Sequence, residues 1–244
     1  MIQFLRIKNR PNRVRRDGGG FSEMALVQKT GKYGAIIKTE GLSKKKCLMV
    51  TGAHSSGKSR WIHRMYDAAG NLWGSRCTKN GPVMLEALHP ILAWSEQDCV
   101  QAWWAEEQAK KPENEQKPWK SLRPHQRADA LPAYVLATGA VVFCDDAHKL
   151  TGRKLQVARA CLMAAKIFVI AASEETQLAP NLRSVVLDRK PQIIRLTSDV
   201  AYDATNVFMW IFMFACMVGG WYEAAAVLGG LKAISSGRRA ARAN

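Results

Sequence analysis

The sequence predicts an α/β fold with a mainly parallel sheet, followed by a hydrophobic C-terminal helix. Short apolar runs, each suited to one buried strand, alternate with segments of helical composition. Strands that alternate with helices imply right-handed βαβ units. The 244 residues are enough for one sizeable α/β domain with appendages. A glycine-rich loop follows one apolar run, and two acidic residues follow another.

The expected elements follow one another between residues 44 and 197. Buried strands are expected at 47–50, 83–85, 140–144, 167–171, 185–187 and 193–196. Helices are expected at 60–69, from 95 onward, at 123–138 and at 153–165. Ser95 is the expected N-cap of the second of these helices, with an acidic first turn. Trp103 and Trp104 on that helix are interpreted as packing residues rather than as a platform for nucleic-acid bases.

The N-terminal segment is strongly basic. The formal net charge is +16, and residues 1–50 carry twelve Lys or Arg against three Asp or Glu. Such an excess favours DNA or anionic lipid as a partner, although basic tails also serve only solubility. Residues 1–20 contain Pro11 and end in three glycines, so they are expected to form an arm or linker. Residues 21–42 receive no assignment, and the basic segment is taken as 1–43.

The C-terminal segment is hydrophobic. Residues 207–231 carry one charge, Glu223, and a spanning helix needs roughly 20 apolar residues. We therefore expect a membrane segment at 201–232 and a basic tail at 233–244, with the α/β domain at 44–200. The alternative is a pair of buried helices broken at Gly219-Gly220, since Glu223 would be costly against lipid.

The six cysteines show no CxxC pair and no metal-ligand spacing. They are interpreted as small buried hydrophobic residues in a reducing compartment, and no zinc site is expected. The first residues lack the apolar run of a secretory signal.

The glycine-rich loop is GAHSSGKS, Gly52 to Ser59, which fits the pattern GxxxxGK[ST] without a mismatch. An expected strand precedes it and an expected helix follows it, which is the context that a phosphate cradle requires. Gly52 and Gly57 would permit the backbone path, Lys58 would contact the β- and γ-phosphates, and Ser59 would bind Mg²⁺. The remaining nucleotide contacts are expected mainly from the backbone of Ala53, His54, Ser55, Ser56 and Arg60. The alternative is a polar loop that fits the pattern by accident.

The acidic residues occur in VVFCDDAHKL, residues 141–150. Four apolar residues place Asp145 at the carboxyl end of a buried strand, where open α/β sheets bind ligands. Asp145 is the expected second Mg²⁺ ligand, and Asp146 the expected general base or water-orienting group. The alternative is an acidic turn that caps the next helix.

Together, GAHSSGKS and VVFCDD resemble the Walker A and Walker B motifs of P-loop NTPases, in the branch with an additional strand that includes AAA+ ATPases. The resemblance covers residues 44–197 and implies a three-layer domain that binds ATP and Mg²⁺. The extra strand of this branch is expected at Val83 to Leu85. The Asp145-Asp146 pair departs from the usual Asp-Glu, which puts the hydrolysis rate in question but not nucleotide binding. GTP is not excluded, although no Asn-Lys-x-Asp segment is present.

The resemblance also implies two further catalytic residues. Ser173, at the end of an expected strand, is similar to a sensor residue, and a plain helix N-cap is the alternative. Arg183 occupies the place of an arginine that acts on a neighbouring subunit's nucleotide, which implies a homo-oligomer. Arg189 and Arg195 compete for that role, and solvated arginines are the alternative for all three.

Two groups within this branch are similar to the chain. Filamentous-phage assembly ATPases of the zonula-occludens-toxin-like group have a "VVxxDDAH" motif and one membrane span. They imply a slow ATPase for assembly or export at a bacterial inner membrane, with the P-loop domain cytoplasmic. Transposition-regulator AAA+ ATPases instead imply a DNA-binding regulator of a mobile element. A nucleotide-gated scaffold with little hydrolysis stays open as a third class, because of Asp146.

Overall fold

The computed structural model describes residues 2–10, 21–30, 35–54, 56–74, 77, 81–196 and 204–221. The chain divides into two units, Met1–Asp199 and Val200–Asn244, and each is described by itself.

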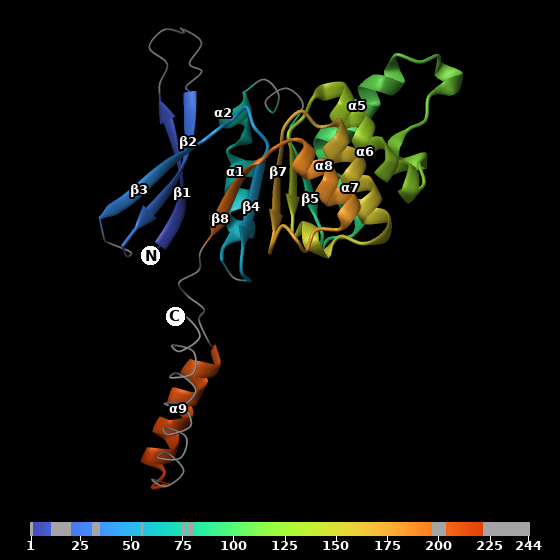
Figure 1. The fold of residues 1–244 in the computed structure, drawn as a ribbon. Coiled ribbons are helices and arrows are strands. Elements are labelled where there is room, and N and C mark those ends of the chain that lie inside the picture. The colour runs from blue at the N-terminus through green and yellow to red at the C-terminus, as the bar shows by residue number, and fades with distance from the viewer. Residues whose placement is uncertain are drawn as a thin grey trace. The chain divides into compact units, whose positions relative to one another are not determined.

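The centre of the first unit is a five-stranded parallel sheet (Figure 1). Its strands lie in the order β5-β6-β7-β4-β8, so they do not follow the order of the chain. Their bounds are β4 Leu48–Gly52, β5 Val83–Glu86, β6 Val142–Asp145, β7 Phe168–Ala172 and β8 Gln192–Leu196. Every residue of β6 and β7 is buried, because a parallel sheet covered on both faces requires apolar side chains on both. The mainly parallel sheet expected from the apolar runs is confirmed.

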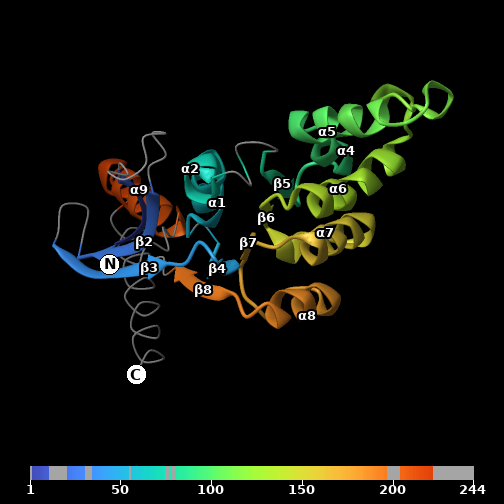
Figure 2. The ribbon, with the colours of Figure 1, turned by 90° about the horizontal axis from the view of Figure 1, so that it is seen from above.

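Helices cover both faces of this sheet (Figure 2). On one face lie α1 (Lys58–Asp67) and α2 (Ala69–Trp73), where the ring of Phe143 in β6 packs edge-on against Tyr66 and Trp73. On the other face lie α6 (Pro124–Thr138), α7 (Gly152–Ala164) and α8 (Pro180–Asp188). Two separate apolar clusters result, one on each side of the sheet.

The segment between β5 and β6 is helical and packs outside α6. It contains α4 (Ile91–Ser95), α5 (Asp98–Ala109) and two short 3-10 helices, η1 (Glu113–Glu115) and η2 (Trp119–Ser121). Trp103 packs on Tyr134 of α6 with ring centroids 5.7 Å apart, which agrees with its interpretation as a packing residue. Ser95 is not an N-cap: it ends α4 and its hydroxyl donates to the Leu92 carbonyl, while Gln97 precedes α5.

One predicted strand is absent, and another is present but is not the additional strand of the branch. Residues 185–187 lie within α8, because Pro180 at the first helical position and the apolar spacing of Leu182 and Val186 favour a helix. Val83 to Leu85 is a strand, but it lies at the sheet edge beside β6. The strand that separates β4 from β6 in the sheet is β7.

The prediction of an arm is wrong for residues 2–10, while residues 11–20 lie outside the described residues. Three antiparallel strands, β1 (Ile2–Arg10), β2 (Phe21–Lys29) and β3 (Ile36–Leu42), form an N-terminal sheet. Alternate residues of it join the core beneath α1 and α2: Leu5, Met24, Leu26 and Leu42. Charged residues lie between these apolar positions. The alternation is the period-2 pattern of a half-buried strand, but the charges make the segment read as a basic arm when only its composition is considered.

Gln192 of β8 fixes the N-terminal sheet to the central sheet. Its side-chain oxygen accepts from the Ser43 N–H (3.0 Å), and its amide nitrogen donates to the Gly41 carbonyl (3.2 Å).

The second unit contains α9 (Ala204–Val218), which ends before Gly219-Gly220. Its described apolar side chains are mostly exposed, including Ile211, Phe212 and Phe214. None of the helices among the described residues is long and apolar enough to cross a membrane. Of the predicted membrane segment, residues 201–203 and 222–232 lie outside the described part of the chain, as does the basic tail.

The six cysteines are free thiols, and all except Cys99 are buried, as small hydrophobic residues would be.

The burial of Leu26 predicts that the N-terminal sheet unfolds together with the domain. Leu26→Ala should lower the free energy of unfolding by about 2–5 kcal/mol, because it leaves a cavity in the core under α2. Ile37→Ala, at a half-exposed position on the same sheet, should change it by less than about 0.5 kcal/mol. Urea unfolding followed by circular dichroism measures both. Equal stability of the two variants would show that the N-terminal sheet does not share the core.

Candidate functional site

The glycine loop (residues 52–57) joins the end of β4 to the start of α1. A Cβ on Gly52 would lie 2.6 Å from the Leu196 carbonyl oxygen and 2.7 Å from the Ser56 hydroxyl, so only glycine fits there. Gly57 has φ 85°, a left-handed conformation, and is the N-cap of α1. It therefore offers no side chain to the first-turn N–H groups of the helix, which have no intrahelical partner. Those donors are left available to an anion.

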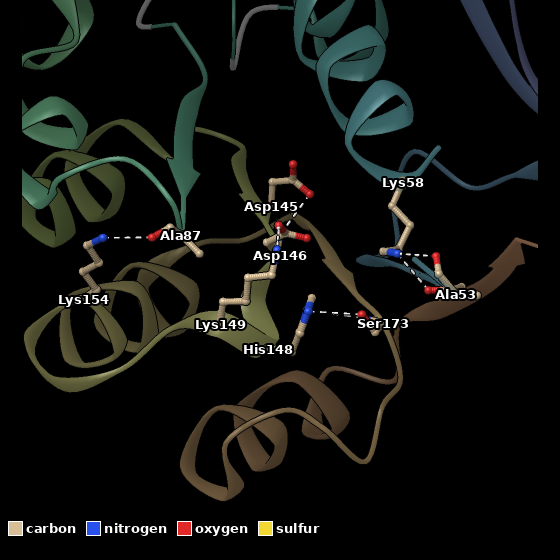
Figure 3. Close-up of polar contacts among 10 residues, drawn as sticks. Ala53, Lys58, Ala87, Asp145, Asp146, His148, Lys149, Lys154 and Ser173 are labelled. Carbon is tan, nitrogen blue, oxygen red and sulfur yellow. Dashed lines mark hydrogen bonds and ion pairs between the residues drawn. The ribbon is translucent and has the colours of Figure 1, made fainter. Parts of the chain in front are cut away.

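Lys58 is the first residue of α1, and its side chain turns back over the glycine loop. The ammonium donates to the carbonyls of Gly52 and Ala53, both at 2.8 Å (Figure 3). Lys58 is only 6% exposed, and burial lowers its pKa, while the charges of Asp146 and Asp145 act in the opposite direction. Since both aspartates act on it, Lys58 lies within electrostatic reach of the end of β6.

The acidic turn (Asp145-Asp146) lies at the carboxyl end of β6. Asp145 is buried, and its Oδ1 accepts from the Asp146 N–H at 2.9 Å. Asp146 has φ 51°, a left-handed conformation that Asp tolerates better than most residues. It precedes the short helix η3 (Ala147–Lys149), and its carboxylate accepts from the Lys149 ammonium at 2.6 Å. Asp146 occupies the N-cap position of η3 but makes no side-chain cap hydrogen bond, and Thr151 is the N-cap of α7, so the alternative of an acidic turn that caps the next helix is not supported.

Ser173 follows β7, the strand between β4 and β6. Its carbonyl accepts from the Gly52 N–H at 3.1 Å. Its own N–H donates to Nδ1 of His148 at 3.4 Å, and its hydroxyl lies 3.1 Å from Nε2 of the same ring. The position between the two motifs fits the sensor interpretation, although no ligand contact tests it.

A cavity of about 670 Å³ lies beside the glycine loop on the β8 side. The loop contributes Gly52, Ala53 and His54, and β8 contributes Ile193 and Arg195. The segment after β7 contributes the remaining polar wall: Ser173, Glu174, Glu175, Thr176 and Gln177. The lining therefore carries both signs of charge, the carboxylates of Glu174 and Glu175 and the guanidinium of Arg195.

The three candidate arginines lie apart. Arg183 on α8 faces Glu175 at 3.9 Å, and its Nε is buried without a hydrogen-bond partner. Arg189 donates to the Met163 carbonyl, and Arg195 lines the cavity. None of them is placed against a neighbouring subunit here, so the arginine role stays a prediction.

The other predicted nucleotide-binding residues lie in the glycine loop and the first turn of α1. Ala53, His54, Ser59 and Arg60 are exposed, and the Ser56 hydroxyl is buried without a partner. Ser55 lies outside the described residues. The sequence did not reveal roles for His148, Lys149 or the residues that follow Ser173. The apolar run that ends before Ser173 could have revealed the residues after Ser173. A parallel strand there places the residues that follow it at the carboxyl edge of the sheet, where the glycine loop and the acidic turn also lie.

The residues present fit Mg²⁺ only together with a phosphate. A hydroxyl from Ser59 and a carboxylate from Asp145 are the hard oxygen ligands that Mg²⁺ prefers. Within the described ranges, no three His, Cys, Asp or Glu side chains are grouped so that they could hold a metal by themselves. The remaining ligands must therefore come from water and from the bound molecule.

The geometry of the glycine loop predicts different costs for two glycine substitutions. Gly57→Ala should lower the free energy of unfolding by about 1–2 kcal/mol, because alanine resists φ 85°. Gly41→Ala should leave it unchanged or raise it, because nothing lies within 4 Å of the added methyl and Ala suits a strand better than Gly. Thermal or urea unfolding compares the two. A neutral Gly57→Ala would contradict the left-handed cap.

The environment of His148 predicts a pH dependence. Burial, followed by smaller effects that include the Lys149 and Lys58 charges, lowers its pKa below the usual 6.5, although Asp146 and Asp145 raise it. Its contribution to stability is therefore fully present above about pH 6.5 and is lost as the pH falls through the lowered pKa. Between pH 7.5 and 5, the wild type should lose more unfolding free energy than His148→Gln. The exposed His125→Gln should follow the wild type, and identical losses in all three proteins would refute the assignment.

No protein-family model and no curated protein matches the chain. Among solved structures, the chain is similar to one described as a metal-chelate type ABC transporter in an inward-facing conformation. The identity is 13% and the TM-score 0.32, with 72% of this chain and 75% of that chain covered. A TM-score of 0.32 establishes no common fold.

Proposed function

We propose that the chain binds a nucleoside triphosphate, with ATP as the expected nucleotide, at the edge formed by the glycine loop and the acidic turn. One observation carries the proposal. A helix without a side-chain cap begins at a buried lysine, directly after a loop in which Gly52 admits no side chain. Such a helix start binds phosphate through its free N–H groups and its dipole.

Lys58 supplies the positive charge that the phosphates need. In the structure its ammonium is held by two backbone carbonyls, which are neutral acceptors. A phosphate oxygen is a stronger, charged acceptor, so Lys58 would exchange at least one carbonyl for the ligand. The exchange requires no change in α1, since Lys58 is its first residue.

The nucleoside end would lie in the cavity beside β8. The carboxylates of Glu174 and Glu175 in its lining would accept hydrogen bonds from ribose hydroxyls or from an exocyclic amine. Mg²⁺, when bound, would neutralise phosphate charge, with Ser59 and Asp145 as its protein ligands.

Hydrolysis is the second part of the proposal, with Asp146 as the residue that orients water. Its carboxylate accepts from the Lys149 ammonium in the structure, and breaking this exposed ion pair would slow turnover several-fold at most. Membrane anchorage through residues 207–231, phage-type assembly, DNA binding by the N-terminal segment and oligomerisation stay predictions from the sequence.

Lys58→Ala tests the proposal. It should weaken ATP binding at least ten-fold, because a charged hydrogen-bond donor to the phosphates is lost. Isothermal titration calorimetry with ATP and Mg²⁺ measures the affinity. The matched control is Lys166→Ala, which removes an exposed lysine before β7 and should bind as the wild type does. Equal affinities of the two variants would refute the proposed site.

A further inference from the structure

Ser173 is hydrogen-bonded to both halves of the candidate site. Its carbonyl holds the Gly52 N–H at the start of the glycine loop (3.1 Å). Its N–H and hydroxyl meet the two ring nitrogens of His148, at 3.4 and 3.1 Å (Figure 3). A continuous chain of hydrogen bonds therefore runs from η3 through Ser173 to the loop.

The two contacts of His148 require one form of the ring. Nδ1 accepts from the Ser173 N–H, so it carries no proton, and Nε2–H is left to donate to the Ser173 hydroxyl. This is the neutral Nε2–H tautomer. Burial disfavours the imidazolium and lowers the pKa of His148, which supports the same form at neutral pH.

The acidic turn and His148 move as one short segment. Only Ala147 separates His148 from Asp146, and it is buried. The Lys149 N–H donates to the Asp146 carbonyl at 2.8 Å, which closes η3 around His148. A shift of Asp145 or Asp146 toward a ligand must therefore displace the imidazole and, through it, Ser173.

We infer that His148 is a positioning residue that couples the acidic turn to the glycine loop through Ser173. The inference rests on the proposed function, because the two coupled events are metal binding at Asp145 and phosphate binding at Gly52 to Ser59. Coupling between two sites is reciprocal, so Mg²⁺ strengthens nucleotide binding by the same factor as nucleotide strengthens Mg²⁺ binding.

A purely structural role for His148 has a different consequence. If the ring only fills space beside β7, its removal lowers stability and weakens ATP binding equally with and without Mg²⁺. If it couples the sites, its removal lowers the Mg²⁺ effect and leaves metal-free binding nearly unchanged. The ratio of the ATP dissociation constants in EDTA and in Mg²⁺ separates the two roles.

The experiment measures that ratio for the wild type and five variants. These are His148→Ala, His148→Gln, Ser173→Ala, the double variant His148→Ala/Ser173→Ala and the control His125→Ala. Glutamine keeps an acceptor and a donor about as far apart as the two ring nitrogens, and it does not titrate. His125 is an exposed histidine at the start of α6, far along the chain from the site.

We expect His148→Ala to reduce the Mg²⁺ effect about five-fold or more, with affinity in EDTA changed less than two-fold. His148→Gln should restore most of the effect, and His125→Ala should match the wild type. The double variant should reduce the Mg²⁺ effect no further than His148→Ala alone, because both substitutions break the same chain of hydrogen bonds. In the wild type, ¹⁵N NMR of the imidazole should show the Nε2–H tautomer.

The inference is overturned if His148→Ala retains the wild-type Mg²⁺ ratio, if glutamine fails to rescue it, or if the ring is the Nδ1–H tautomer. If His148→Ala does not fold, His148→Gln and Ser173→Ala against the wild type, together with the tautomer, decide the matter. These outcomes leave the proposed function standing as long as Lys58→Ala weakens ATP binding at least ten-fold. A wild type that binds no ATP in either condition refutes both.

Discussion

The candidate site depends on how closely the ends of β4, β7 and β8 approach Gly52. The Gly52 N–H donates to the Ser173 carbonyl after β7, and the space of a Cβ is filled by the Leu196 carbonyl of β8. These two contacts limit the direction in which the backbone can continue from β4, and they fix the glycine loop at Gly52, its first residue. The direction of α1, the position of Lys58 and the wall of the neighbouring cavity all follow from that contact. A larger side chain at position 52 would have to move backbone rather than a rotamer.

Opposite charges are placed around the glycine loop before any ligand arrives. Lys58 and Lys149 face Asp145 and Asp146 across the edge of the sheet, and the charges influence one another. Burial of the Lys58 ammonium costs desolvation free energy. Its hydrogen bonds go to backbone carbonyls rather than to carboxylates. A triphosphate would bring a charged acceptor to an ammonium whose hydrogen-bond acceptors are neutral carbonyls. The arrangement therefore favours an anion at the loop.

Local patterns predicted the central sheet and the site motifs, but not the contacts between distant segments. Apolar runs such as Val142 to Cys144 have one interpretation, because a strand buried on both faces must be continuous in its apolar character. The N-terminal sheet was missed since its apolar residues alternate with charges, and their burial depends on α1 and α2. Val185 and Val186 are β-branched and favour a strand, but packing on the core favoured a helix. The contact between His148 and Ser173 joins residues 25 apart, and no local period encodes it.

The ion pair of Asp146 with Lys149 is too weak to prevent catalysis by itself. Lys149 is 40% exposed, and a pair of this kind contributes up to about 1 kcal/mol, so breaking it costs at most several-fold in rate. The left-handed backbone at Asp146 is a stronger constraint, because the whole turn must move to redirect the carboxylate. That movement is opposed by the buried Asp145 and by the contact of His148 with Ser173. In the proposed ATPase, the position of the turn, rather than the charge of Lys149, would therefore limit how readily Asp146 reaches water at the γ-phosphate. Replacing Lys149 alone would free the carboxylate without moving it.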